Sequence, residues 1–419
     1  MKNVRIYRKE EPDMKRVLML SDTASLQDLN NRCNLNLLLE LNCDVHVGCN
    51  FLFGNTTPPD RVYAFRDELE EAGISWHQLN FIYSPDKPVK DPDIITEIEG
   101  ILQEYRFDLI HCLSPSALLC AAKPAAKLRI PLFFTSYGFP FYKGAGPLRW
   151  LRCYRKFKQT VKHADVLICT NREDYALAEK SFTAKHTYRI PGIGIDPYRF
   201  RAPSISRAQM RERLEIPQNA VTLITIGALT ADKNHAVILK AMSRLRMLEL
   251  HYVIVGTGPK TDALYQLTSH LNLEDRVHFT KYRDDVADIL HACDIFCLPS
   301  RREALGIAAL EAMEAGLPLV TSNVQGIRDF MEDGATGFMF KPKDINGFVA
   351  GIEALTEDKR LRQHMGEHNR YAVEPFYREN PEHIMRQLYQ VQLDLNPDGK
   401  PKAAKLRKRK RKKKRNVEI

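Results

Sequence analysis

Two glutamates, Glu303 and Glu311, lie eight positions apart in the stretch SRREALGIAALEAMEAGLP, which begins at Ser300. The apolar residues 295–298 predict a buried strand, and residues 307–315 predict a helix that a Gly and a Pro bring to an end. This order places Glu303 just before the helix, and Glu311 lies within the helix, about two turns after Glu303. Because a carboxylate accepts hydrogen bonds from hydroxyl groups, one glutamate could hold a sugar and the other a ribose.

The start of this helix also predicts a site for phosphate. The free N–H groups of Gly306, Ile307 and Ala308 would face the carboxyl end of the strand, where a helix N-terminus favours anions. Alternatively, the two glutamates belong to a solvated face of an amphipathic helix, which is what we expect for Glu314. The glycine at the turn, the small residues of the helix and the strand on each side favour a grip on a nucleotide sugar.

These residues resemble the E-x(7)-E motif of glycosyltransferase family 4, whose members are retaining enzymes with the GT-B fold. The resemblance covers most of the chain. It extends to VTSNVQGIRDFMEDGATGF (320–338), IGALTADKNHAVIL (226–239), TSYGFPFYKGAG (135–146) and IPGIGIDPYRF (190–200). The last two segments are similar to parts of bacterial capsule and exopolysaccharide glycosyltransferases.

The resemblance implies a donor site made of both glutamates, a lysine and the helix N-terminus. Glu311 would bind the ribose hydroxyls, and Glu303 would contact the donor sugar near the transferred carbon as a catalytic residue. A departing diphosphate needs cations or oriented N–H donors, and the family pattern places Lys233 on it. The alternative is that Lys233 is a surface lysine at a helix start.

One diphosphate cation of the family is missing from this chain. Most relatives have arginine where this sequence has Ala228. Either Lys233 and the helix dipole are sufficient to stabilise the diphosphate, or transferase activity is weakened. Arg301 or Arg302 could substitute, although either could equally be a solvated loop residue.

The acceptor side also departs from the family. The resemblance implies an acceptor-side loop that includes Tyr137, Gly138 and Lys143, and it makes His111 a second catalytic candidate. Relatives commonly carry histidine where this chain has Tyr137, and the usual histidine two residues after His111 is Leu113. Alternatively, the aromatic loop packs against its own domain and His111 is a satisfied structural residue.

We expect neither a metal nor a cofactor, since the nucleotide sugar is the substrate. No D-x-D stretch follows a strand, and the nine cysteines include no C-x-x-C pair. Buried thiols are therefore expected rather than disulfides or a zinc site. The family's retaining outcome is usually explained by attack on the face from which the phosphate departs, with that phosphate helping to deprotonate the acceptor.

Positioning of these residues requires two α/β domains. A chain of 419 residues is too long for one ordinary core. Helical segments, among them 26–41, alternate with strands. The strands are predicted at 16–20, 44–49, 108–111, 131–135, 165–170, 221–226, 251–255, 276–280, 294–298 and 319–321. The Pro- and Gly-rich residues 188–203 predict a hinge between the halves.

The predicted fold is therefore α/β, with two doubly wound Rossmann-like domains facing an interdomain cleft. In the resembled GT-B fold, a C-terminal helix crosses back to the first domain. We expect an N-terminal extension (1–14), an acceptor-side domain (15–195), a nucleotide-sugar-binding domain (205–374), a crossover helix (375–396) and a disordered polybasic tail (397–419).

Net charge is concentrated in that tail. The whole chain has a net charge of +10, and residues 400–419 contribute +11. The remaining residues therefore carry a net charge of −1. Nine consecutive cations, Arg407 to Arg415, predict contact with an anionic membrane surface. Nucleic acid is a less favoured partner, and a solubilising tail is the alternative. Without an apolar run long enough to span a bilayer, and with a charged N-terminus, we expect a cytoplasmic protein at the inner face of the membrane.

The function predicted is that of a retaining glycosyltransferase. It would move a hexose-type sugar from a nucleotide-diphosphate donor, expected to be a UDP-sugar, to a lipid-linked or polysaccharide acceptor in capsule, exopolysaccharide or other cell-surface glycan synthesis. Two alternatives remain: a GT-B-like sugar-nucleotide epimerase, and a binding or scaffold protein that has kept the fold with weakened catalysis.

Overall fold

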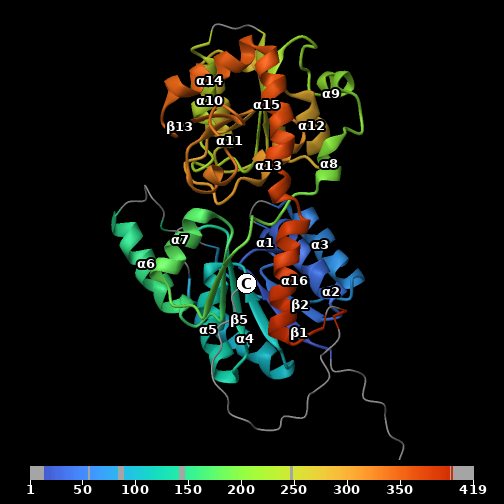
Figure 1. Cartoon of the computed structure of the whole chain (residues 1–419), viewed down its shortest axis with the longest axis vertical. Coiled ribbons are helices and arrows are strands. Elements are labelled where there is room, and N and C mark those ends of the chain that lie inside the picture. The colour runs from blue at the N-terminus through green and yellow to red at the C-terminus, as the bar shows by residue number, and fades with distance from the viewer. Residues whose placement is uncertain are drawn as a thin grey trace, which may run out of the picture.

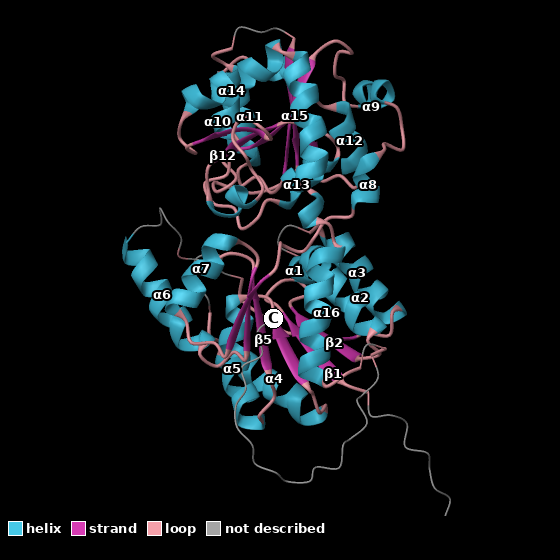
Figure 2. Ribbon diagram, in the orientation of Figure 1, coloured by secondary structure: helices cyan, strands magenta, loops and turns pink. Residues whose placement is uncertain are grey.

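The computed structural model has two α/β domains, one above the other in Figure 1. It describes residues 14–54, 57–83, 89–139, 141, 147–245, 249–396 and 398–399. The predicted contributions of residues 1–13, of Lys143 and of the tail from Arg407 to Arg415 lie outside this part of the chain. Each domain is built on one parallel sheet with helices on both faces, which confirms the predicted fold class (Figure 2).

The first sheet has the strand order β3-β2-β1-β4-β5-β6-β7. Its central strands are apolar runs buried on both faces, as parallel strands covered by helices must be. The strands are β1 Arg16–Leu20, β2 Asp44–Cys49, β3 Ser75–Gln78, β4 Leu109–Cys112, β5 Leu132–Ser136, β6 Val166–Cys169 and β7 His186–Arg189.

The helices of the first domain alternate with these strands, and several of them begin at a polar side chain that caps the helix. Ser114 caps α5 by accepting from the N–H of Ala117, and Asn171 caps α7 by accepting from that of Asp174. Asn31 separates two helices where the helical pattern predicted one continuous segment. The helices are α1 Ala24–Asn30, α2 Arg32–Glu40, α3 Pro59–Glu71, α4 Pro92–Glu104, α5 Pro115–Leu128, α6 Pro147–Val161 and α7 Arg172–Ser181.

The second sheet has the strand order β10-β9-β8-β11-β12-β13. All five strands predicted here are present, and each end lies within one residue of its predicted position. The strands are β8 Val221–Ile226, β9 Leu250–Val255, β10 Val277–Lys281, β11 Ile295–Leu298, β12 Leu319–Ser322 and β13 Gly337–Phe340. The helices are α8 Pro197–Arg201, α9 Arg207–Arg213, α10 Ala236–Met242, α11 Thr261–His270, α12 Val286–Ala292, α13 Ile307–Glu314, α14 Ile345–Glu357 and α15 Lys359–Ala372.

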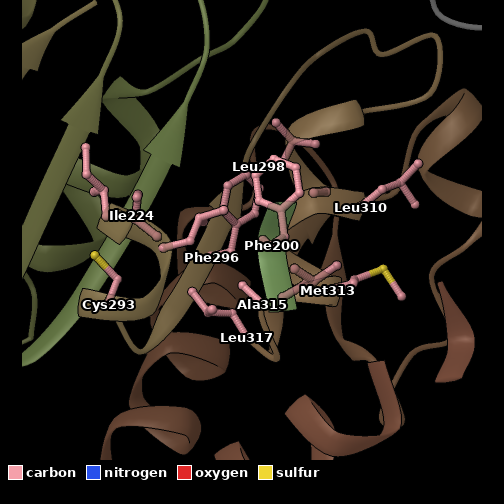
Figure 3. Close-up of a cluster of buried hydrophobic side chains, with 14 of the residues drawn as sticks. Phe200, Ile224, Cys293, Phe296, Leu298, Leu310, Met313, Ala315 and Leu317 are labelled. Carbon is pink, nitrogen blue, oxygen red and sulfur yellow. The ribbon is translucent and has the colours of Figure 1, made fainter. Parts of the chain in front are cut away.

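Buried side chains of β11 and α13 pack against each other and thereby fix the two ends of the loop that joins these elements. Phe296 and Leu298 of β11 lie against Leu310 and Met313 of α13, and Phe200 of α8 completes the cluster (Figure 3). All five side chains are buried. Such density leaves little freedom for the strand and helix ends that carry the candidate site.

Two connections pass side by side between the domains. Ile195 lies in the first connection, and its N–H donates to the carbonyl of Phe376 in the second at 3.0 Å. In return, the N–H of Arg378 donates to the carbonyl of Ile195 at 2.9 Å. Gly194, with φ of +78°, allows this approach, since a Cβ there would lie 2.4 Å from the Cα of Arg378. The segment predicted as a hinge, 188–203, includes the end of β7 and all of α8.

The last helix, α16 Glu379–Leu393, returns to the first domain, as the predicted crossover requires (Figure 1). Its buried residues Met385, Tyr389 and Leu393 belong to a core cluster of that domain. Tyr389 stacks on Phe133 of β5 with ring centroids 6.1 Å apart. The C-terminal helix therefore ties the two domains together through apolar packing.

Candidate functional site

The candidate donor site lies where β8 and β11 end, at the carboxyl edge of the second sheet. Gly306 precedes α13 with φ of +91°, a conformation that suits glycine. A Cβ at this position would lie 3.0 Å from the Leu298 side chain. The N–H groups of Gly306, Ile307 and Ala308 donate no hydrogen bond to any described residue. These N–H groups at a helix N-terminus form an arrangement that suits phosphate.

Lys233 and Glu303 meet at this edge from two different loops. The ammonium of Lys233 lies 2.6 Å from Oε2 of Glu303, and the hydroxyl of Ser300 donates to the same oxygen at 3.2 Å. Glu303 is the less exposed partner, with 12% of its side chain accessible against 27% for Lys233. The structure thus brings a cation and a carboxylate together next to the start of α13.

Glu311 lies about one turn into α13 and is partly buried. Its carboxylate has no hydrogen bond or ion pair with any described residue. Burial raises its pKa to about 7, and the nearby Arg199 of α8 opposes this rise. An unpaired, partly buried carboxylate is chemically suited to accept hydrogen bonds from ligand hydroxyls.

The two arginines that could replace the missing cation at Ala228 are engaged elsewhere. Arg301 donates to the side-chain oxygen of Asn234 at 3.2 and 3.3 Å. Arg302 reaches the other domain, where it donates to the carbonyls of Gly138 at 3.1 Å and Phe139 at 2.8 Å. In this conformation Arg302 therefore joins the donor loop to the acceptor-side loop.

The described part of the acceptor-side loop is mostly packed into its own domain. Phe139 and Phe141 are fully buried and stack at 5.2 Å, which confirms the alternative interpretation for these aromatic residues. Gly138 has φ of +102°, and a Cβ there would lie 3.1 Å from the Cβ of Ala304. The hydroxyl of Tyr137 donates to the carbonyl of Asn30 at 3.3 Å. Gly138 is therefore the point where this loop contacts the donor domain.

His111 lies in the core of the first domain, and its contacts match the alternative interpretation of a satisfied structural residue. It is fully buried, and its ring nitrogens lie 2.8 Å from the Tyr389 hydroxyl and 2.8 Å from the Thr135 hydroxyl. Burial lowers its pKa to about 3, so the ring is neutral. It is a core residue that links β4, β5 and α16.

Glu314 also differs from its expected solvated position. Its side chain is 1% exposed and accepts hydrogen bonds from Arg201 at 2.8 Å and from Tyr377 at 2.7 Å. Sequence periodicity missed this because α8 and the segment before α16 cover that face of α13.

Two buried carboxylates near the facing strand ends were not identified from the sequence. Asp174 accepts from the N–H of Phe139 at 3.1 Å and holds the acceptor-side loop; burial raises its pKa to about 6. Asp22 follows β1, and burial likewise raises its pKa to about 6. Their signals, an Asn-x-x-Asp cap before α7 and a Ser-Asp-Thr after the first strand, are too common to predict a site.

The described residues contain no cluster of His, Cys, Asp and Glu suited to a metal ion. All nine cysteines are free thiols, and eight of them are buried, as their apolar surroundings predict. Every helix in the described ranges is too short or too polar to cross a bilayer.

Two facing Rossmann-like domains, joined by adjacent connections and a returning C-terminal helix, define the GT-B architecture. The sequence matches the family described as glycosyl transferases group 1 over residues 206–371, and the glycosyl transferase 4-like domain over residues 36–190. An uncharacterised glycosyltransferase of Haemophilus influenzae is 30% identical over 287 residues, which cover 68% of this chain and 76% of that protein. The chain therefore belongs to the family of GT-B glycosyltransferases that these domains define, which confirms the resemblance to family 4.

Other relatives share most of the chain. The putative glycosyltransferase EpsD of Bacillus subtilis is 27% identical over 310 residues, 72% of this chain and 81% of that protein. An Escherichia coli UDP-Gal:α-D-GlcNAc-diphosphoundecaprenol α-1,3-galactosyltransferase is 27% identical over 286 residues, 65% and 72% of the two chains. Anabaena Alr3699/HepE, solved with UDP and glucose, has the same fold, with a TM-score of 0.73, 19% identity and coverage of 90% of this chain and 100% of that one.

Proposed function

We propose that this glycosyltransferase transfers a hexose from a UDP-sugar to a lipid-linked glycan acceptor, with retention of anomeric configuration and without a metal ion. The observation that carries the proposal is the grouping of Lys233, Glu303 and the free N–H groups at the start of α13 at one sheet edge, with Glu311 about one turn further along the helix. The names of the E. coli galactosyltransferase and of the UDP complex of the Anabaena protein support the donor, and the E. coli name supports a lipid-linked acceptor.

The proposed division of labour follows from charge. The diphosphate of the donor would accept hydrogen bonds from the N–H groups of Gly306, Ile307 and Ala308 and would attract Lys233. Lys233 would then give up part of its interaction with Glu303, leaving that carboxylate to accept hydrogen bonds from sugar hydroxyls. Glu311 would accept hydrogen bonds from the ribose hydroxyls. Stabilisation of the leaving diphosphate is the catalytic contribution of this half of the site.

The same arrangement supports the retaining step. The leaving β-phosphate oxygen, held on the side of α13, would take the proton of the acceptor hydroxyl as the glycosidic bond to UDP breaks and the new bond forms on the same face. The acceptor would approach from the first domain, where Gly138 contacts Ala304 beside Glu303. The described residues place neither His111 nor another histidine at that contact.

Measurements of donor binding and of sugar transfer separate this proposal from its alternatives. Isothermal titration calorimetry with UDP should show binding to the wild-type chain and weaker binding to Lys233→Ala and Glu311→Ala. Incubation with UDP-glucose or UDP-galactose and an undecaprenyl-diphosphate-linked sugar should then release UDP and lengthen the lipid-linked glycan. Binding without transfer to any acceptor would support a scaffold, and interconversion of donor sugars without an acceptor would support an epimerase.

A further inference from the structure

The acid-free stretch that contains α6 is the largest charge asymmetry of the sequence outside residues 400–419. Residues 109–164 contain ten Lys or Arg and no Asp or Glu, whereas the chain outside residues 400–419 has a net charge of −1. Several cations elsewhere in the first domain have carboxylate partners, as in the Arg61 pairs with Asp28 and Glu68. Such a segment is suited to an extended anionic partner.

The outward face of α6 concentrates this charge. Four exposed cations lie along it and a fifth, Lys162, follows in the turn after the helix. None of the five forms an ion pair with a described residue: Arg152, Arg155, Lys156, Lys158 and Lys162. The opposite face packs into the domain through Cys153, Phe157 and Val161. At 3.6 residues per turn, the four cations of the helix share one side of it. Figure 1 shows α6 at the outer side of the first domain, opposite α2 and α16.

Two leucines lie on the same outward face, at the N-terminal end of the helix. Leu148 is 73% exposed and Leu151 is 43% exposed. Exposed leucines contribute nothing to binding of phosphate groups alone. Beside cations, however, apolar side chains can enter the boundary between lipid headgroups and acyl chains. The combination favours a membrane over a nucleic acid.

The position of α6 gives this surface a role. Trp150 and Tyr154 of α6 contact Phe141 with centroid distances of 6.1 and 5.6 Å. Phe141 in turn stacks on Phe139, whose carbonyl accepts from Arg302 of the donor domain. The helix is therefore packed directly beside the loop that contacts the donor domain at Gly138.

We propose that the outward face of α6 docks on a bilayer rich in anionic headgroups and thereby holds the acceptor side of the enzyme at the membrane. This inference deepens the proposed function, since a lipid-linked acceptor would be presented at that surface. It does not depend on the residues 400–419, whose charge would add to the same attraction.

The test uses the full chain and two triple variants of equal charge. The first, Arg152→Gln/Arg155→Gln/Lys156→Gln, removes three charges from α6. The control, Arg213→Gln/Lys359→Gln/Arg360→Gln, removes three exposed charges from the second domain. Co-sedimentation is measured with phosphatidylcholine vesicles and with vesicles that also contain phosphatidylglycerol. We expect the α6 variant to lose about a hundredfold in partitioning to the anionic vesicles, at about fivefold for each of the three charges removed.

The leucines are tested separately with Leu148→Ser/Leu151→Ser. This variant should bind at low salt but lose the part of vesicle binding that persists when salt screens the charges. Repeating the triple variants in a chain that ends at Asp398 removes the contribution of the tail, and the α6 effect should persist there.

Three results would overturn the inference: equal binding by the α6 and control variants, binding that follows the tail alone, or an α6-dependent affinity for duplex DNA without vesicle binding. UDP calorimetry on the same proteins keeps this test apart from the proposed function. The α6 variant should bind UDP like the wild type, and failure of every protein to bind UDP would remove the proposed function while leaving the vesicle result interpretable.

Discussion

The ammonium of Lys233 lies 2.6 Å from Oε2 of Glu303, although the two residues are 70 positions apart in the chain. The pair joins the loop after β8 to the loop after β11, and each loop starts at the carboxyl end of its strand. In the donor complex that we propose, the diphosphate would draw Lys233 away from this carboxylate. Donor binding and the freedom of Glu303 would then be coupled through one ion pair.

Removal of the Lys233 ammonium should weaken UDP binding by about 10- to 100-fold, as expected for loss of a charge-assisted hydrogen bond. Lys233→Arg should recover part of the affinity. Lys240→Ala, an exposed lysine on α10, is the matched control and should bind like the wild type. Calorimetry measures all three, and a Lys233→Ala protein that binds UDP normally would remove Lys233 from the donor site.

Neutralisation of Glu303 should separate binding from turnover. In Glu303→Gln, Lys233 loses its carboxylate partner and is free for phosphate, so the affinity for UDP alone should be unchanged or higher. Transfer of the sugar should fall by at least about tenfold if the carboxylate contacts the donor sugar. Affinity for UDP is measured by calorimetry and transfer by UDP release. Loss of UDP affinity in this variant would show that Glu303 serves mainly to hold Lys233 in place.

Glu311 should make both stability and donor binding depend on pH. Its pKa is raised from 4.5 to about 7 in the folded chain, so the unfolded chain loses this proton at lower pH than the folded chain does. Its contribution to stability is therefore complete below about pH 4.5 and is lost as pH rises through about 7. Affinity for UDP should change in the opposite direction, since the ionised carboxylate is the better acceptor for ribose hydroxyls.

The substitution Glu311→Gln should abolish both of these pH dependences and weaken UDP binding. Glu353→Gln, at an exposed position on α14, controls for the loss of one carboxyl group. Thermal unfolding and calorimetry across the range from pH 5 to pH 8, which brackets the raised pKa of about 7, measure the two effects. Identical pH profiles for Glu311→Gln and the wild type would contradict the assignment.

Loss of the Arg302 side chain should affect the relation between the domains rather than donor affinity. Arg302→Ala removes two charge-assisted hydrogen bonds to Gly138 and Phe139, which together contribute a few kcal/mol at most. We expect nearly unchanged UDP binding, a lower transfer rate and a larger radius of gyration in small-angle X-ray scattering. Weaker UDP binding with an unchanged radius would instead show that Arg302 acts on the diphosphate.

His111 should matter for stability and not for chemistry. In His111→Phe the hydroxyls of Tyr389 and Thr135 lose their partner in the core, at a cost of about 1–3 kcal/mol for each unsatisfied group. Transfer activity per folded molecule should be retained. In a double-mutant cycle, Tyr389→Phe should cost less in the His111→Phe background than in the wild type, because both changes remove the same hydrogen bond. Loss of activity without loss of stability would instead support a catalytic role for His111.

The central strands could be predicted because burial on both faces demands continuous apolar runs, as in β8, β9 and β11. Edge strands have no such demand. β3 has the sequence SWHQ and β7 has the sequence HTYR, and both are partly exposed, so their polar residues gave no strand signal. The break between α1 and α2 was also missed, since Asn31 continues an otherwise helical pattern.

The donor half of the site was largely accessible from sequence. Parallel strands bring their carboxyl ends to one edge, so the loops that carry Lys233 and Glu303 had to meet once the strand order was known. Gly306 marked the turn into α13, and its positive φ shows why a glycine stands there. These are consequences of local pattern and of parallel topology.

By itself, the sequence determined the fold class, the central strands, the family and the residues from which a donor site could be built. Tertiary structure decided which of these residues are available. It enclosed His111 between β5 and Tyr389, covered Glu314 with Arg201 and Tyr377, and turned Arg302 toward Gly138. The physical reason is that periodicity reports one face of one element, whereas burial and charge pairing depend on what other elements, up to 278 residues away in the chain, place against that face.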